Sequence, residues 1–329
     1  MRRRLAARLQ GATVGPFPSG EAPPQGCDAV VLLESRLSDA GLIRRCLGAG
    51  RHVLLVAYPW LTADALDGLA AAAPRAGTQL AVLNPDRFLP SRQVIRQQLD
   101  AGRIGEPGLV RSHRWEHAAP AGGAEMASEM EGEAELESGA KTEREAELES
   151  AGDPASLGTA GGMAGMARDL DVALWLMGTA PNLVYALEQV SPVNLDTDAR
   201  DRTSGHAMQV HLGFPGGGMA LIDYAGTLPP GDGYQALSVI GSTGAAYADD
   251  HQNMQLVYSG GCPRAVGVGE GGKELLALVQ AFVSGLSQGD DLSASAAAWK
   301  TAMAVVAAAQ GSAARGQAVP LEAITMEGV

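Results

Sequence analysis

Runs of consecutive apolar residues alternate with amphipathic stretches over the first third of the chain. Apolar runs typical of strands buried on both faces cover residues 28–33, 52–58, 79–84 and 109–115. Helix-like spacing of apolar residues follows the first three runs, at residues 38–50, 61–77 and 92–102. Strands that alternate with helices at this spacing predict right-handed βαβ units and a doubly wound parallel sheet.

The pattern changes after residue 160. One apolar face of a predicted helix over 161–178 is formed by Met166, Leu170, Ala173, Leu174 and Met177. Strand-like runs separated by turn residues then follow at 182–190, 206–214, 219–226, 234–241, 246–250 and 254–260. Predicted helices at 273–286 and 294–313 close the chain. This order is typical of an α+β domain with a large, mainly antiparallel sheet of hairpins.

Residues 119–158 interrupt the two patterns. The segment is rich in Ala, Gly and Glu, and it contains the string EAELES at 133–138 and again at 145–150. It has no aromatic, valine or isoleucine side chain to bury, so we expect a disordered acidic insertion, with an acidic lid or docking segment as the alternative. The predicted domains are therefore 1–118, an incomplete Rossmann-like unit, and 159–329, an α+β unit. We expect the C-terminal helix of the second unit to pack back on the first.

Composition excludes several classes of protein. The net charge of the 329 residues is −13, of which −9 falls between residues 125 and 153, so no basic stripe remains for nucleic acid. No apolar run reaches the roughly 18 residues of a membrane span, and Arg8 interrupts the short apolar stretch near the N-terminus. The three cysteines lack metal-binding spacing. We expect a cytoplasmic protein that binds neither membrane, nucleic acid nor metal.

Four stretches carry motifs in a fixed order. They read DAVVLL…AGRHVLLVAYP, then RFLP…GRIGEP, then GMARDLDVALWLMG, and finally ALSVIGSTGAAYADD with LVQAFVSGLSQGD. In this order the chain resembles the Gfo/Idh/MocA family of nicotinamide-dependent sugar and polyol oxidoreductases, over nearly all of residues 27–321 apart from the insertion. The resemblance implies a dinucleotide-binding domain, a substrate domain for a small sugar-like ligand, and a homo-oligomer formed through the open face of the antiparallel sheet.

The start of the chain departs from the family. Family members begin with a strand, a GxGxxG loop and a helix that together hold the cofactor pyrophosphate. Residues 1–12 here already resemble the helix that follows the family's second strand, and no such loop precedes residue 28. The acidic residue that binds the ribose is missing with it. Leu33, Glu34 and Ser35 follow the first predicted strand, where the cofactor would pass, and a carboxylate at Glu34 would repel a pyrophosphate.

Two further departures concern proton transfer. Tyr58 takes the place of the lysine in the family's Glu-Lys-Pro motif. A phenol with a reference pKa of about 10 is a poor base at neutral pH, and packing at a strand end is the alternative role. Arg168 stands where the family's helix carries its catalytic histidine, and Asp171 matches the family's aspartate. An arginine can bind a carboxylate but does not act as a base. A local ion pair between Arg168 and Asp171 is the alternative interpretation.

The remaining histidines are weak signals. His113 and His117 flank Trp115, and alternation places Arg111, His113 and Trp115 on one face of a strand. We interpret His113 and His117 as structural. His206 and His211 lie in the predicted hairpin sheet, and we expect both at the surface or in an interface.

Three missing features therefore predict an oxidoreductase-like protein that binds no nicotinamide cofactor and performs no hydride transfer. It would instead bind a ligand in the old cleft, or serve as a structural or regulatory partner of an active relative. The alternative is an active oxidoreductase that uses NAD or NADP on a sugar- or polyol-like substrate. That alternative requires a start upstream of Met1 or another chain that completes the sheet. A third hypothesis is an interaction module that uses the acidic repeat.

Overall fold

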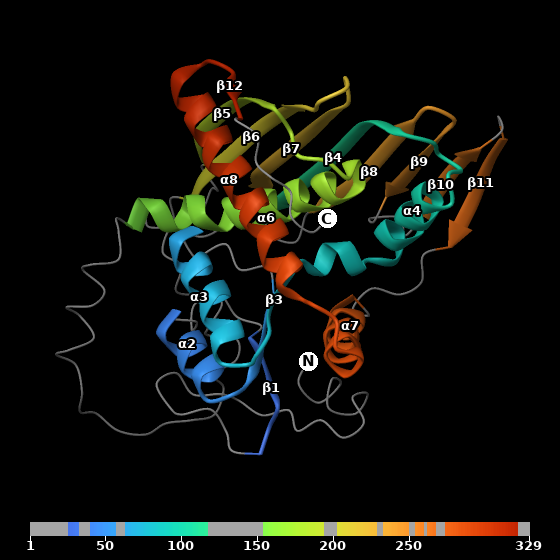
Figure 1. The fold of residues 1–329 in the computed structure, drawn as a ribbon. Coiled ribbons are helices and arrows are strands. Elements are labelled where there is room, and N and C mark those ends of the chain that lie inside the picture. Colours follow the sequence, from blue (N-terminus) through green and yellow to red (C-terminus); the bar gives the residue numbers. More distant parts are fainter. Residues whose placement is uncertain are drawn as a thin grey trace, which may run out of the picture.

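The residues that the structure describes form two separate β-sheets with helices between and beside them (Figure 1). The computed structural model describes residues 26–32, 40–56, 63–117, 154–193, 203–228, 233–249, 254–259, 262–267 and 274–321. The insertion at 119–158 and the N-terminal segment expected to be a helix lie largely or wholly outside these ranges.

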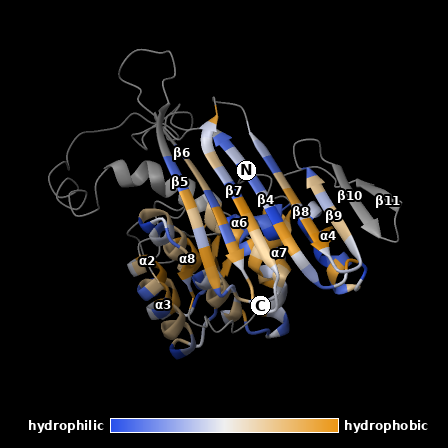
Figure 2. Ribbon diagram, turned by 90° about the horizontal axis from the view of Figure 1, so that it is seen from above, coloured by the Kyte–Doolittle hydropathy of each residue, from blue (hydrophilic) through white to orange (hydrophobic). Residues whose placement is uncertain are grey.

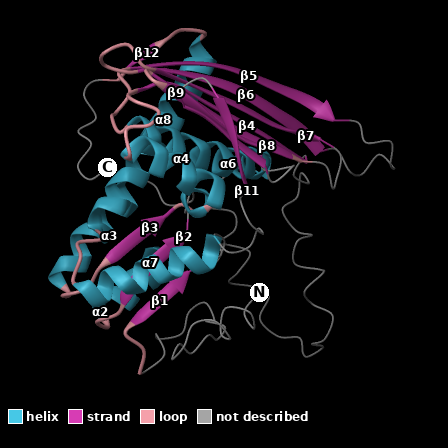
Figure 3. Ribbon diagram, turned by 90° about the vertical axis from the view of Figure 1, so that its right-hand side faces the viewer, coloured by secondary structure: helices cyan, strands magenta, loops and turns pink. Residues whose placement is uncertain are grey.

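The smaller sheet holds three parallel strands in the order β1 (Ala29–Leu32), β2 (His52–Val56) and β3 (Leu80–Leu83). Apolar side chains cover both of its faces, as the sequence predicts. Val53 and Leu55 share a cluster with residues of α2 (Ala40–Gly48) and α3 (Ala63–Arg75). Leu54 points the other way, into a cluster with residues of α7 (Glu274–Gln288) (Figure 3). The expectation of βαβ units is confirmed for these three strands.

The fourth predicted strand differs from its expected place. The chain leaves β3 through a short 3₁₀ helix, η1 (Pro85–Phe88), and helix α4 (Pro90–Asp100), and then enters β4 (Pro107–His117). β4 lies in the larger sheet, parallel to β7 and antiparallel to β8. Backbone hydrogen bonds from Ser242 and Thr243 to Glu106 and Ile104 tie its start to that sheet. A strand pattern alone does not reveal which sheet the strand joins.

The larger sheet has nine strands in the order β11-β10-β9-β8-β4-β7-β6-β5-β12. Its remaining strands are β5 (Leu183–Val193), β6 (Thr203–Gly213), β7 (Met219–Leu228), β8 (Tyr234–Gly241), β9 (Gly244–Asp249), β10 (Met254–Ser259), β11 (Cys262–Gly267) and β12 (Val319–Pro320). Every neighbouring pair is antiparallel except β4 and β7. The prediction of a large, mainly antiparallel sheet is confirmed. Strands β11 and β12 were not predicted from the sequence.

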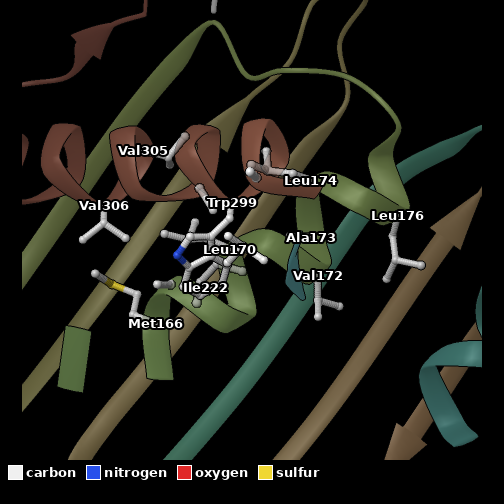
Figure 4. Close-up of a cluster of buried hydrophobic side chains, with 14 of the residues drawn as sticks. Met166, Leu170, Val172, Ala173, Leu174, Leu176, Ile222, Trp299, Val305 and Val306 are labelled. Carbon is white, nitrogen blue, oxygen red and sulfur yellow. The ribbon is translucent and has the colours of Figure 1, made fainter. Parts of the chain in front are cut away.

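Helices α6 (Pro154–Met177) and α8 (Ser293–Arg315) lie between the two sheets (Figures 1 and 3). Trp299 of α8 is 1% exposed and sits among side chains of α6, with Ile222 of β7 close by (Figure 4). The five residues predicted to form the apolar face of α6 are all buried. Burying one large side chain of this kind stabilises a fold by about 1.5–3 kcal/mol. The core between the sheets therefore fixes where α6 lies. Separately, none of the described helices is long and apolar enough to cross a membrane.

The described helices leave the other face of the large sheet open (Figure 2). Arg111, His113 and Trp115 alternate along β4 on this face, as predicted, and Trp115 is 38% exposed. Other exposed large apolar side chains on the same face are Leu183, Leu187, Met219, Ile240 and Tyr247. This set of residues is called the open face below.

Candidate functional site

Helix α6 brings three charged residues to the junction of the two sheets. Arg168, Asp169 and Asp171 follow its buried Met166 and occupy neighbouring turns of the helix. Successive helical residues are rotated by about 100°. Asp169 therefore faces β4 of the large sheet, while Asp171 faces the end of β3. Asp169 and Asp171 are each 2% exposed.

Asp171 is held by residues that directly follow β3. Arg87 binds it in a two-pronged geometry, with Nε 2.7 Å from Oδ2 and Nη2 2.6 Å from Oδ1. Asn84 donates to Oδ2 of Asp171 at 2.8 Å and to the carbonyl of Arg168 at 2.8 Å. The guanidinium of Arg87 also lies over the ring of Trp175. The carboxyl end of β3 is thus bonded to α6.

Asp169 belongs to a second buried group of charges centred on Arg114. The Arg114 guanidinium donates to Asp169 at 2.7 Å through Nε and at 3.0 Å through Nη2. It also forms ion pairs with Asp86 and, at 3.2 Å, with Glu116. Ser112 donates to Asp169 at 3.0 Å. A buried charge is tolerated only when it is paired in this way.

The ionised forms of this group are stabilised by one another. Burial raises the pKa of Asp86, but the charges of Arg114, Arg168 and Arg92 outweigh it, and the net pKa lies below its ordinary value. Burial lowers the pKa of Arg114, but Asp169 and Asp86 raise it well above its ordinary value. Neither residue can exchange a proton near neutral pH.

Arg168 is bound much less closely than Arg114. Its guanidinium lies 3.8 Å from Asp86 and 3.9 Å from Glu116, which is beyond hydrogen-bond distance. Its Nε is buried without a hydrogen-bond partner among the described residues. The interpretation of a local ion pair between Arg168 and Asp171 is wrong, because Asp171 is bound by Arg87 and Asn84, and Arg168 faces Asp86 and Glu116.

The other predicted site residues lie outside the described residues. These are Tyr58, Leu33, Glu34 and Ser35. Sequence reasoning missed most of the junction, namely Asn84, Asp86, Arg87, Arg114 and Asp169. Two signals could have found them. The polar string Asn84-Pro85-Asp86-Arg87 directly follows a buried parallel strand, where functional groups gather. The strand 109–115 also carries polar residues on both faces, which is unusual for a central strand.

The protein resembles known proteins in structure rather than in sequence. No protein-family model matches the sequence, and no curated protein matches it. Among solved structures, a putative myo-inositol dehydrogenase from Sinorhizobium meliloti shares 21% identity at a TM-score of 0.64, over 91% of this chain and 82% of that one. An aldose-aldose oxidoreductase from Caulobacter crescentus shares 17% identity at a TM-score of 0.66, over 89% and 79%. An oxidoreductase from Agrobacterium radiobacter, solved with NAD+, L-tartaric acid and magnesium, shares 16% identity at a TM-score of 0.64, over 90% and 80%.

These likenesses identify the architecture. The chain has the fold of Gfo/Idh/MocA-type oxidoreductases. The resemblance found in the sequence is confirmed at the level of the fold. Helix α6, which meets β3 and β4 at this junction, carries Arg168 and Asp171, the positions that the resemblance matched to the family's catalytic helix.

The described residues that follow β3 are bonded to α6 and to one another, and these bonds bear on whether a nicotinamide dinucleotide could be held there. In open parallel sheets such a cofactor lies at the carboxyl ends of the strands. At the end of β3, Nδ2 of Asn84 donates to Asp171 and to the carbonyl of Arg168, both on α6. Its Oδ1 accepts from the backbone N–H of Asp86 at 3.0 Å. The buried carboxylates of Asp86 and Asp171 are paired with Arg114 and Arg87, so these two arginines are already used and are not free to bind a phosphate. The ends of β1 and β2 lead into residues outside the described ranges.

The spacing GxGxxG does occur once in the sequence, at residues 267–272. It follows an unsuitable strand, because Gly267 ends β11, which is antiparallel to β10 in the large sheet. The phosphate-binding loop of a dinucleotide fold instead follows the first strand of a βαβ unit. Among the described residues, no group of His, Cys, Asp and Glu could hold a metal ion.

Proposed function

We propose that this protein keeps the oxidoreductase fold but does not transfer hydride, and that it acts as a ligand-binding or regulatory protein. The observation that carries the proposal is Arg168 at the helix position of the catalytic histidine, beside carboxylates that are already bound by Arg114 and Arg87. A guanidinium accepts no proton at neutral pH. The ion pairs at the junction therefore stabilise the contact between the two sheets, and they do not transfer protons.

Calorimetric titration of the full chain with NAD(H) and NADP(H) tests this proposal. We expect no saturable heat from any of the four nucleotides. The variant Arg168→His restores the histidine of the family's helix, and it should behave as the parent does, because Asn84 and Arg87 remain bound to Asp171 at the carboxyl end of β3. Micromolar binding by the parent chain would overturn the proposal. Binding by the variant alone would show that Arg168 itself blocks the cofactor.

An active oxidoreductase is the second candidate. The likeness to a structure solved with NAD+, which covers 90% of this chain, favours it. Under this alternative, NAD or NADP would bind, and the substrate would be a sugar- or polyol-like compound. The same titration separates the two candidates. An in-frame GxGxxG upstream of Met1 in the genomic DNA would also support the alternative.

We further propose a cytoplasmic homo-oligomer formed through the open face. Several large apolar side chains are exposed there, including Leu187 at 51% and Met219 at 54%. Several exposed large apolar side chains on one face of a sheet are typical of an interface. Tyr247 and Trp115 would supply aromatic contacts, which are common at such interfaces. Light scattering that finds only monomer would refute this part.

A further inference from the structure

The strands at the ends of the two sheets differ in how their outer backbone groups are protected. The small sheet ends at β1 and β3, and the large sheet ends at β11 and β12. The outer N–H and C=O groups of such a strand have no neighbouring strand to bond, and they are a template for a further strand. Natural sheets therefore protect their edges with charges, prolines, very short strands or neighbouring elements.

Three of the four edges have protection of this kind. Beside β3, Oγ of Ser295 on α8 accepts from the backbone N–H of Val82 at 3.1 Å. At the β12 end of the large sheet, Ser312 of the same helix accepts from the N–H of Ala186 in β5 at 3.0 Å, and β12 itself has only two residues. The sequence of β11 contains a proline followed by an arginine. Helix α8 therefore protects one edge of each sheet.

The outer edge of β1 has none of these features among the described residues. Its sequence, Ala-Val-Val-Leu, contains no charge and no proline. The N–H of His52 in β2 donates to the carbonyl of Asp28 at 2.9 Å, and Ala29 is in register with His52. In a parallel ladder, the bonding groups of successive residues alternate between the two sides of a strand. The N–H and C=O groups of Ala29 and Val31 therefore point away from β2, and this row is called the free edge below.

The side chains next to the free edge leave both apolar clusters of the small sheet incomplete. Val30 and Leu32 are each 8% exposed, whereas the two β2 residues in the same cluster are 0% exposed. Ala29 and Val31 are only partly buried against the other cluster, in which Leu54 of β2 is 0% exposed. β1 is the outermost strand of this sheet (Figure 3). A further strand with apolar side chains on both faces would complete the two clusters.

We propose that the free edge binds an extended apolar segment of another protein, which adds a fourth strand to the small sheet. Ala29 and Val31 supply two N–H donors and two C=O acceptors to the backbone of that segment. Its successive side chains would point to opposite faces and extend one cluster each. A run of about four Val, Ile or Leu residues meets both demands, because such runs suit strands that are buried on both faces. In this mode of recognition the main-chain bonds give affinity, and the side-chain contacts give specificity.

The length of the free edge favours a single segment over a second folded copy of this chain. Four residues of a strand span about 13 Å. A stable interface between two folded proteins uses about 800 Å² of each partner, which is much more surface than one short strand edge offers. The open face has the exposed apolar side chains that such an interface needs. The proposal therefore goes beyond the loss of hydride transfer, and it uses a different surface from the proposed oligomer.

The test measures backbone amide exchange of the full chain by NMR, with the synthetic peptide acetyl-KGVIVVGK-amide as the probe. At a peptide concentration about ten times its Kd, the amides of Ala29 and Val31 should exchange roughly tenfold more slowly, because few free edges remain unoccupied. The amide of Val30 is the internal control, since it points towards β2 and its exchange should not change. The same peptide with N-methyl groups on its two central residues should slow neither outer amide.

Three results would overturn the proposal. The first is unchanged exchange of Ala29 and Val31 with saturating peptide. The second is slow exchange of these amides without peptide at every protein concentration, which would mean that the chain covers its own edge. The third is slow exchange without peptide only at high protein concentration, which would make a second copy the occupant.

A pair of variants at one position separates edge binding from other effects. Val31→Pro removes an outward N–H without removing a donor to β2, and proline is tolerated in edge strands. It should weaken peptide binding roughly tenfold, the effect of losing one hydrogen bond and leaving its partner unpaired. The matched control Val31→Thr keeps the N–H and the branched side chain, so it should bind as the parent does. Unchanged binding by Val31→Pro, once circular dichroism shows that it folds, would refute the site. If that variant does not fold, the N-methylated peptide tests the same bonds.

Discussion

The two faces of the large sheet carry similar residue types in opposite surroundings. On the helix-covered face, Arg114 is 5% exposed and binds Asp169 and Asp86. On the open face, His113 and Asp223 form a pair whose side chains are 24% and 25% exposed. Residues of both groups alternate along the same strand, β4. Burial, rather than residue type, therefore decides how much a pair of this sheet contributes to the stability of the fold.

The largest expected effect comes from Arg114→Met. Removing this guanidinium leaves the buried carboxylates of Asp169 and Asp86 without their main partner, which costs about 3–5 kcal/mol in unfolding free energy. Arg111→Met removes an arginine of the same strand that lies on the open face. The unfolding free energy should change by no more than about 0.5 kcal/mol. Urea unfolding of the two variants measures both. Similar losses would mean that burial does not separate the two faces.

A smaller loss is expected from Gly226→Ala. The new methyl group would lie 2.8 Å from the Tyr224 hydroxyl, and overpacking of this kind costs about 1–3 kcal/mol. In a Tyr224→Phe background the clashing oxygen is gone, and the same substitution should become nearly neutral. Thermal unfolding of the single and double variants measures the coupling. Additive losses would contradict the placement of the hydroxyl over Gly226.

Acid should weaken the covered face selectively. The pKa of Asp86 is lower in the folded protein than in the unfolded chain, so this residue stabilises the fold above the ordinary aspartate pKa of about 4. That contribution is lost as the pH falls below about 4 and through the folded-state pKa. In urea unfolding, the parent and Asp86→Asn should therefore converge in stability at low pH. Asp67→Asn, which alters an exposed pair with Lys300, should show no such convergence.

The smallest effect on stability is expected on the open face. Trp115→Glu places a charge in the proposed interface between copies of the chain and should shift light scattering towards monomer. Its unfolding free energy, measured at a protein concentration where the parent is also monomeric, should change by only about 0.5 kcal/mol. A large loss in the monomer would show that Trp115 supports the fold itself.

The sequence predicted the positions of helices and strands along the chain better than it predicted which strands pair with one another. Apolar periodicity located β1, β2, β3 and the buried face of α6, because burial on both faces leaves a continuous apolar run. It assigned β4 to the smaller sheet, since a strand pattern carries no information about its partners. It also missed β12, which consists of Val319 and Pro320 alone. Short edge strands have too few residues to show a period.

The candidate site was predictable only in part. Family resemblance identified Arg168 and Asp171, which lie on one helix in a recognisable string. Arg114 and Asp86 came from other elements, and their pairing depends on how β4 and η1 meet α6 in space. His206 was expected at the surface or in an interface, because an alternating strand does not reveal which of its faces the helices cover, and it is only 5% exposed. Long-range pairings such as His206 with Tyr224 depend on strand register, which the sequence alone did not fix.

The central proposal is that the paired charges at the junction of β3 and α6 hold the two sheets together and bind no redox cofactor. A crystal of the full chain grown with saturating NADH tests it most directly. The account predicts that Arg87 stays bound to Asp171, and that no dinucleotide is ordered against residues 30–60. Ordered nicotinamide beside Asn84, with Arg87 displaced from Asp171, would contradict it.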